Sequence, residues 1–522
     1  MTKQFTKSIW LISVLATLAC ARTGPDVIVI TATFEPAGAV DVSPSLTAPV
    51  ATPIAFVPPT LNPPRIQSDA SSLQQYTVQA GDTLGVIANT NSTSVEALLA
   101  INDIPNPDIL SVGQVINLPA QPTDETPPVK IIPDGRFVRG ESGSEFDVEA
   151  FVREQPGYIN TAADLVRQRQ ANGTEIRVPL TGAQIIDRVA TEFSVDPRLL
   201  LALLEYRSGW LTNPSPAEDM IRYPMGEVDE AREGLYRQLT WTADRLNRGY
   251  YGWRYRNLKI IQVDDGTRLF YHPQLNAGTV AVQYFLSLNN TLPVWEEQVS
   301  EGGFDAFYRT LFGDPFSGEI ATPVPMDIAQ PELTLPFASG EVWFYTGGPH
   351  GGWGSGSAWA AVDFAPPDER TAGQPACYTS TFPIRAVAAG NIVRSGNGAV
   401  VLDMDGDSNE ATGWSILYLH IATAGRIEAG QTVATGDVIG YASCEGGFST
   451  ATHMHIGRRY NGEWIPAYCN DCETETEVPV FRMSGWAVIG FDDQEYQGII
   501  VQGNERRQAE QGRQNPINRV SW

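Results

Sequence analysis

The chain has few histidine and cysteine residues, five of each among 522. Basic residues are also scarce: 35 Lys and Arg stand against 60 Asp and Glu, so the formal net charge is −25. A negative field of this size repels nucleic acid and acidic lipid headgroups, and neither is an expected partner. The apolar run at residues 9–19 is shorter than the roughly 20 residues that a membrane-spanning helix needs. It therefore does not predict a spanning segment.

The N-terminal segment has the pattern of an export signal. Lys3 and Lys7 precede the apolar run, and Cys20 follows it directly. The stretch LATLAC, residues 15–20, resembles a bacterial lipobox, although Thr17 stands where that family usually has Leu. The resemblance implies that residues 1–20 are a signal peptide, that Cys20 is lipidated, and that the protein is extracytoplasmic, either lipid-anchored to the cell membrane or secreted. Ordinary cleavage without a lipid is the alternative.

Export to an oxidising compartment bears on the other four cysteines, an even number suited to disulfides. The pairing that we favour joins Cys377 to Cys444 and Cys469 to Cys472. The CNDC stretch alone is also compatible with a redox or metal pair. No second CxxC accompanies it, however, and this disfavours that alternative.

A chain of 522 residues is too long for one core, so two or three folded units joined by linkers are expected. Residues 21–72 are rich in Pro and Thr and predict an extended stalk. Residues 73–120 predict the order strand, helix, helix, strand, with the first helix beginning near Leu84 and the second capped by Ser94.

This second segment resembles a LysM module. The opening YTVQAGDTL, Asn102 after the second helix, and the closing VGQVINLP all match that family. The resemblance implies binding to a glycan that contains N-acetylglucosamine, and peptidoglycan is the expected partner. A small spacer domain is the alternative.

Residues 121–146 are rich in Pro and charge and predict a linker, whereas residues 147–318 predict a mainly helical domain. The clearest helices are residues 184–193 and 197–208. Asp196 followed by a proline is a strong helix start, and Gly209 is a plausible stop.

The run FSVDPRLLLALLEYRSGW resembles the part of lysozyme-like lytic transglycosylases that carries their catalytic acid. Arg207 occupies the position of that acid, and a guanidinium does not release a proton near neutral pH. Glu205 is two residues away, roughly 200° around the helix. We therefore expect a non-catalytic domain that binds glycan or acts as a spacer. Glycan cleavage by Glu205 is the rival interpretation.

Histidine is concentrated in the last third of the chain, which contains four of the five: His350, His420, His453 and His455. The same region alternates with a period of two over residues 384–393, 399–403, 414–420 and 452–456. Residues 331–522 are therefore expected to form an all-β domain with an antiparallel sheet.

On a strand, residues two apart share a face, so His453 and His455 point into one space. Zinc explains such a pair, because a catalytic zinc commonly has three protein ligands drawn from imidazole and carboxylate groups. His350 lies in a Gly-rich loop, TGGPHGGWGSG, that is able to approach a metal. Asp363 lies in the apolar run AWAAVDFAPP, where a carboxylate is costly to bury unless it meets a cation. His420 is the fourth imidazole.

From about residue 332 onwards the chain resembles the lysostaphin-type and β-lytic zinc endopeptidases of metallopeptidase family twenty-three. The common form of that family has a compact His-x-x-x-Asp pair, but Trp359 stands at that position here. The β-lytic branch separates the two residues by a longer Gly-rich loop. That pattern implies one Zn²⁺ per chain, held by His350, Asp363 and His455, and it implies catalytic roles for His420 and His453.

The sequence thus predicts a multidomain protein: a small α+β LysM module, a mainly α lysozyme-like middle domain, and an all-β zinc peptidase domain that cuts peptide cross-links of peptidoglycan. The rival from another class is a non-catalytic wall-binding regulator. His272 lies outside the cluster and is expected to be an ordinary domain histidine. Four aromatic residues are assigned to the core and not to the site: Trp353, Trp359, Tyr418 and Trp464.

Overall fold

The computed structural model describes residues 73–522, except for residues 92, 94, 108, 120, 319–322, 326, 370–372, 471, 473–477, 493 and 514–515. All of these described residues belong to one compact unit, residues 59–522. The predicted signal peptide, Cys20, the stalk and Ser94 lie outside the described residues. Among the described helices, none is both long and apolar enough to cross a membrane.

The first folded segment has the predicted β-α-α-β order, with β1 (Leu73–Thr77), α1 (Leu84–Thr90), α2 (Val95–Ile101) and β2 (Val115–Pro119). β1 and β2 pair antiparallel, with Tyr76 opposite Ile116. Asn102 joins the second helix to the second strand: its Nδ2 donates to the carbonyls of Leu98 (2.9 Å) and Asn117 (2.8 Å), and its Oδ1 accepts from the Asn117 N–H. One amide side chain therefore fixes the packing of this small unit.

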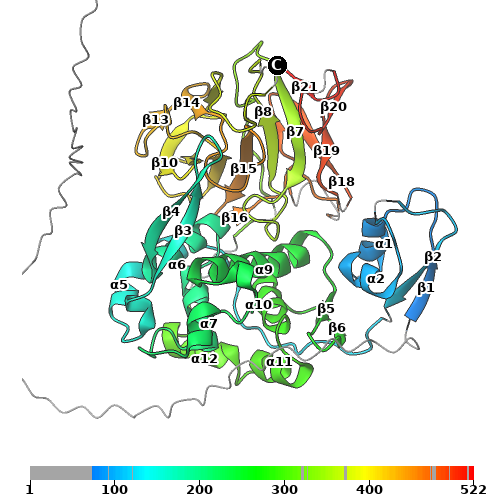
Figure 1. Ribbon diagram of the computed structural model, residues 1–522, viewed down its shortest axis with the longest axis vertical. Coiled ribbons are helices and arrows are strands. Elements are labelled where there is room, and N and C mark those ends of the chain that lie inside the picture. The colour runs from blue at the N-terminus through cyan, green and yellow to red at the C-terminus, as the bar shows by residue number, and fades with distance from the viewer. Residues whose placement is uncertain are drawn as a thin grey trace, which may run out of the picture. The chain divides into compact units, whose positions relative to one another are not determined.

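The middle region is mainly helical, as predicted, but it also contains the hairpins β3–β4 and β5–β6 (Figure 1). Its α-helices are α3 (Asp134–Phe137), α4 (Glu141–Ser144), α5 (Val148–Arg153), α6 (Gly182–Phe193), α7 (Pro197–Ser208), α8 (Glu218–Arg222), α9 (Leu235–Tyr255), α10 (Ala277–Ser287), α11 (Leu292–Val299) and α12 (Phe304–Phe312). The strands are β3 (Ala163–Arg169), β4 (Glu175–Thr181), β5 (Ile260–Gln262) and β6 (Arg268–Phe270).

The helix signals around α7 are confirmed. The Asp196 carboxylate accepts from the Arg198 N–H at 2.9 Å, Pro197 is the first helical residue, and Gly209 ends the helix with φ 66°. The lysozyme-like identity of this region stays a prediction.

The segment predicted as a linker, residues 121–146, is partly a folded element of the middle region. Ile131, Ile132 and Phe137 are almost fully buried and belong to the same core as α6 and α7. Phe137 stacks on Tyr250 of α9 with ring centroids 4.4 Å apart. The prediction was wrong here because the Pro-rich composition concealed a few apolar residues that only the tertiary fold buries.

The C-terminal region is an antiparallel β domain. Its main sheet has nine strands in the order β13-β10-β11-β12-β15-β8-β7-β21, with β16 paired to β15. These strands are β7 (Trp343–His350), β8 (Ala361–Ala365), β10 (Gly390–Gly396), β11 (Ala399–Asp403), β12 (Trp414–Leu419), β13 (Thr432–Val433), β15 (Met454–Tyr460), β16 (Glu463–Trp464) and β21 (Arg519–Val520).

Two smaller sheets complete the β domain. β9 (Pro383–Arg385) pairs with β14 (Val438–Tyr441), and a four-stranded sheet contains β17 (Arg482–Met483), β18 (Trp486–Phe491), β19 (Gln494–Gln502) and β20 (Glu505–Gln508). The period of two over residues 384–393 predicted one strand there, but the chain divides it between β9 and β10. The Ala386 N–H still donates to the Asp437 carbonyl next to β14, and the chain then passes to β10, which belongs to the main sheet.

The two faces of the main sheet have different partners. Ile416 and Tyr418 of β12 point into a core formed within the β domain. Leu417 and Leu419, on the opposite face, belong to the core that contains the helices of the middle region. The middle region is therefore packed against one face of the sheet and is not a separate spacer.

A buried carboxylate joins α9 to the β domain. Glu463 of β16 is fully buried and accepts from the hydroxyls of Tyr250 (2.9 Å) and Tyr255 (2.6 Å). Its Oε1 also lies 2.8 Å from Nε of half-buried Arg254, which gives an ion pair between the two regions. These contacts fix α9 against β16, which pairs with β15, the strand that carries His455.

Candidate metal centre

Strand register brings the histidine cluster together. In the main sheet β8 lies between β7 and β15, and β12 lies on the other side of β15. Asp363 of β8 is directly opposite His455 of β15, and Leu419, which precedes His420, is opposite His455 on the other side. His350 ends β7 beside β8. Residues that are up to 105 positions apart in the chain therefore meet at one end of the sheet.

The side chains of His350, Asp363 and His455 converge in the buried interior. Nε2 of His350 is 2.9 Å from Nδ1 of His455. Oδ1 of Asp363 lies 3.2 Å from Nε2 of His350 and 3.3 Å from Nδ1 of His455. All three side chains are buried, and their possible ligand atoms form a group able to hold a metal ion.

The protonation of the two rings follows from their outer nitrogens. Nδ1 of His350 donates to the Gly348 carbonyl at 2.8 Å, and Nε2 of His455 donates to the Gly352 carbonyl at 3.1 Å. A carbonyl only accepts, so these nitrogens carry the protons and the inner nitrogens present lone pairs. In their neutral forms the two rings thus direct lone pairs at each other and at the carboxylate oxygen. Burial by itself lowers the pKa of His350, but the Asp363 carboxylate outweighs burial and raises that pKa, so the group attracts positive charge, which either a metal ion or an added proton supplies.

The arrangement fits zinc. Ligand atoms about 2.0–2.1 Å from a tetrahedral zinc lie about 3.3 Å from one another, close to the separations of 2.9, 3.2 and 3.3 Å found here. Oδ1 of Asp363 is buried without a hydrogen-bond partner, as a vacant ligand atom would be. Two imidazoles and one carboxylate are also a donor set typical of catalytic zinc, because they leave a fourth position open.

Glycine is required at two positions around this group. A Cβ atom on Gly347 would lie 2.6 Å from Oδ2 of Asp363, and one on Gly352 would lie 2.4 Å from the Trp464 ring. Trp464 is in turn held by α9, because its N–H donates to the Tyr251 hydroxyl at 3.0 Å. The chain of contacts from α9 through Trp464 to Gly352 ends at the carbonyl that orients His455.

His420 and His453 lie beside the three converging residues, with their ring centroids 4.5 Å apart. Nδ1 of His420 donates to the Glu445 carbonyl at 2.9 Å, and Nδ1 of His453 donates to the Ala451 carbonyl at 2.8 Å. Both Nε2 atoms are therefore left unprotonated, and that of His453 is 3.7 Å from Oδ2 of Asp363. His420 also has φ 66°, a left-handed conformation that is unusual for a side chain other than glycine.

Burial and charge determine the ionisation of the group. Burial, together with the neighbouring His453 and His455, lowers the pKa of His420 well below its usual value. Burial by itself raises the pKa of Asp363, but the adjacent His350 and His453 outweigh it and hold that pKa well below the usual range. The site therefore contains a neutral imidazole next to an ionised carboxylate at neutral pH.

The structure places the other predicted residues as follows. Cys377 is bonded to Cys444, and Cys469 to Cys472.

His350 is the last residue of a strand and not part of a loop, since β7 pairs with β8 as far as Ala361. Sequence reasoning missed the carbonyl groups that orient the rings, because a backbone acceptor leaves no signal in residue identity.

The predicted core residues also take definite places. Tyr418 and Trp464 are almost fully buried, and Trp359 lines a small hollow next to α9. His272 lies outside the cluster, with Nε2 3.8 Å from a Glu125 carboxylate oxygen.

The rival site in the middle region is differently arranged. The Glu205 carboxylate accepts from the N–H groups of Leu211 (2.6 Å) and Thr212 (3.3 Å) and from the Thr212 hydroxyl. Arg207 is buried, its guanidinium 5.3 Å from the centroid of the Phe285 ring, and burial lowers its pKa to about 10. Glu205 therefore secures the end of its own helix.

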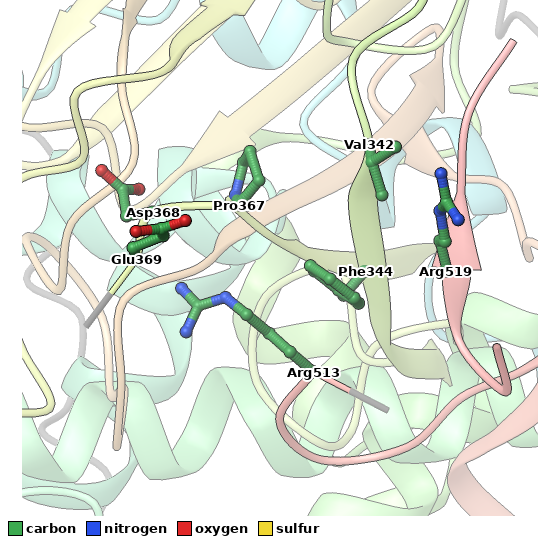
Figure 2. Close-up of a pocket in the computed structure, with 7 residues that line it drawn as sticks. All are labelled: Val342, Phe344, Pro367, Asp368, Glu369, Arg513 and Arg519. Atoms are coloured by element: carbon green, nitrogen blue, oxygen red, sulfur yellow. The ribbon is translucent and has the colours of Figure 1, made fainter. Parts of the chain in front are cut away.

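A hollow of about 660 Å³ opens at the far edge of the β domain, where β7 and β21 are neighbours (Figure 2). None of the four clustered histidines lines it. Its charges are used locally: Asp368 accepts from Ser380 and Thr381, and Arg513 donates to the Pro366 carbonyl at 2.9 Å. This hollow is not part of the metal centre.

Fold and site together describe an antiparallel β domain in which two imidazoles and one carboxylate could hold a metal ion. The LysM domain family matches residues 76–119, and peptidase family M23 matches residues 372–466. The latter range includes His420, His453 and His455, whereas His350 and Asp363 precede it. The N-terminal domain family of LasA matches residues 130–325.

Known proteins with similar sequences agree. Protease LasA of Pseudomonas aeruginosa is 23% identical over 355 residues, which cover 64% of this chain and 74% of that protein. N-acetylmuramoyl-L-alanine amidase XlyB of Bacillus subtilis is 46% identical over 50 residues, 10% of this chain and 16% of that protein. Among solved structures, the deep-sea M23 metalloprotease pseudoalterin has a TM-score of 0.26 at 22% identity, covering 35% of this chain and 96% of its own.

The chain thus contains a LysM domain and a peptidase domain of family M23, and these matches support an enzyme of the metalloendopeptidase class that acts on peptidoglycan.

Proposed function

We propose that the protein is a zinc-dependent endopeptidase that hydrolyses peptide cross-links of bacterial peptidoglycan while its LysM domain holds it to the wall. One observation carries the proposal: two imidazole nitrogens and a buried carboxylate oxygen, all possible zinc ligands, converge within 3.3 Å of one another. One Zn²⁺ per chain, held by His350, Asp363 and His455, satisfies all three atoms.

When bound, zinc supplies Lewis acidity, which polarises a scissile carbonyl and makes water acidic near neutral pH. The chain's own residues supply the proton transfers. Burial lowers the pKa of His420, so its Nε2 carries no proton at neutral pH and is free to take one from the attacking water and to pass one to the leaving amine. His453, whose ring centroid lies 4.5 Å from that of His420, is the second proposed catalytic residue, and it shares these proton transfers or stabilises the developing oxyanion.

The LysM domain supports the choice of substrate. A module that binds wall glycan raises the local concentration of the attached peptide stems, which benefits an enzyme that works on an insoluble polymer. The predicted organisation belongs to the same proposal: a signal peptide ending at a lipidated Cys20, a stalk at residues 21–72, LysM at 73–120, the middle domain, and the peptidase domain at 331–522.

Zinc content and the release of new amines from purified peptidoglycan test the proposal. The wild-type chain is expected to hold one zinc and release amines, and His455→Ala is expected to do neither. His272→Ala is the matched control, because it removes the one histidine outside the cluster and should change neither result. A wild-type chain that binds the wall without zinc and without releasing amines would instead be a non-catalytic regulator.

A further inference from the structure

The hairpin β3–β4 extends from the middle region to the rim of the metal centre. Its strands pair antiparallel from Ala163 opposite Thr181 to Arg169 opposite Glu175, and Gly173 forms the turn with φ 81°. No residue between positions 168 and 176 is buried. This outer half of the hairpin therefore contributes nothing to the core of the middle region, and its length needs another explanation.

The outer half pairs with a main-chain edge of the β domain. The Cys444 N–H donates to the Ala171 carbonyl at 3.2 Å, and the Gly446 N–H donates to the Arg169 carbonyl at 3.1 Å. The two segments form an antiparallel bridge at Arg169 and Gly446. The spacing of two residues on each side is that of a strand added to a sheet edge.

The Arg169 side chain secures this contact. Its Nη1 donates to the Ser449 carbonyl, and its guanidinium lies 5.6 Å from the centroid of the Phe448 ring. The Phe448 side chain is otherwise 85% exposed. At the tip, a Cβ atom on Gly173 would lie 2.9 Å from Sγ of Cys377, so the turn rests on the Cys377–Cys444 disulfide.

The edge that the hairpin occupies is attached to both histidines that do not belong to the metal-binding group. The carbonyl of Glu445, between the two paired N–H groups, accepts from Nδ1 of His420. The Ser449 hydroxyl is 3.3 Å from Nδ1 of His453. A peptide lying along this edge therefore passes directly beside the groups that we assign to proton transfer.

We infer that the Cys444–Gly446 edge is the seat of an extended stretch of the substrate peptide, and that the hairpin occupies it as an internal competitor. This inference rests on the proposed function. An extended peptide gains affinity from main-chain hydrogen bonds to such an edge, and the Ala171 and Arg169 carbonyls use these same donors. Because the hairpin is part of the chain, its effective concentration is of millimolar order and exceeds that of a dilute substrate.

The sheet face supports the same conclusion. Cross-strand partners share a face, so His455 lies on the side of Leu419, which the middle region covers. The middle region therefore bounds the metal centre on that side, and the hairpin occupies the Cys444–Gly446 edge next to the two histidines. A substrate strand binds when the hairpin withdraws.

A shortened hairpin tests the inference in the full chain. Replacing residues 168–176 by Asn-Gly leaves the Val166–Val178 and Arg167–Arg177 pairs joined by a two-residue turn, and it removes both competing carbonyls. An internal competitor reduces the apparent affinity by the fraction of open molecules. In the shortened form we expect KM for a soluble cross-linked muropeptide to fall about tenfold or more, with kcat unchanged. The KM of Arg169→Ala should lie between those of the wild-type and shortened forms.

Arg167→Ala is the matched control, because Arg167 lies on the same hairpin and pairs only with exposed Glu175 at 3.8 Å. Zinc content and the unfolding midpoint establish that each variant is folded and loaded. An unchanged or higher KM in a folded, zinc-loaded shortened form would overturn the inference and make the hairpin part of the substrate-binding wall. If no form hydrolyses the muropeptide, the proposed function fails. The Kd of the muropeptide then decides the inference separately, because the inference requires tighter binding to the shortened form than to the wild-type chain.

Discussion

Two regions of this molecule resemble hydrolase sites in sequence, and the structure separates them by what their polar atoms do. Around Glu205, the carboxylate accepts hydrogen bonds from the end of its own helix. Around Asp363, one carboxylate oxygen lacks any hydrogen-bond partner and faces two imidazole nitrogens. The first region uses its functional group for folding, whereas the second keeps it available.

An unpartnered buried atom is not a sufficient mark of a site. Arg207 also has buried guanidinium nitrogens without partners, but its guanidinium lies against the face of the Phe285 ring and is not part of the metal-binding groups among the described residues. What distinguishes Asp363 is convergence: its unpartnered oxygen and two imidazole nitrogens, all possible metal ligands, lie within 3.3 Å of one another. The predictions below test that distinction.

The largest effect is expected from His455→Ala. Removal of one of three ligands abolishes zinc binding and the several kcal/mol of stabilisation that the metal contributes, so the rate of amine release falls about a thousandfold or more. Zinc analysis and peptidoglycan hydrolysis measure the two losses together. Full activity in a zinc-free variant would show that the Asp363 region is not a metal-dependent site, and it would remove the difference between that region and the Glu205 region.

His420→Ala should reduce kcat by about 10²–10⁴-fold while zinc remains bound, because a proton-transfer group is lost and all three ligands stay. Zinc stoichiometry next to single-turnover rates measures this separation. Loss of zinc together with activity would assign His420 to the metal-binding group instead.

Glu463→Ala tests the contact between the two regions. The change removes the buried acceptor of the Tyr250 and Tyr255 hydroxyls and of Nε of half-buried Arg254, and we expect about 3–5 kcal/mol of destabilisation. Denaturant unfolding measures it. Glu297→Ala, which removes a carboxylate of α11 outside this network, serves as a control and should change the free energy of unfolding little.

Glu205→Gln should have the smallest effect. Hydrogen bonds from the Leu211 and Thr212 N–H groups lose a charged acceptor, which costs about 1–2 kcal/mol of stability, while amine release stays unchanged. Thermal unfolding and an assay for new sugar ends measure both. Sugar ends released by the wild-type chain and absent from this variant would show that the middle region cuts glycan.

Much of the local structure could be predicted from the sequence. Asp196, Pro197 and Gly209 mark the ends of α7 because capping and φ preferences act within a few residues. The β-α-α-β order of the first unit and the strand at Ala399–Asp403 follow from short-range periodicity in the same way. The prediction failed at residues 121–146, where burial of Ile131 and Phe137 depends on helices far along the chain.

For the metal centre, the residue types and the shared face of His453 and His455 could be predicted, because strand alternation is a local property. The tertiary structure alone decided which nitrogen of each ring is free, since that depends on the carbonyls of Gly348 and Gly352. It also decided that the middle region covers the face of the sheet that carries the site, and that a hairpin from it reaches Gly446. A sequence pattern records that a face is buried, but which distant segment buries it is settled only when the whole chain packs.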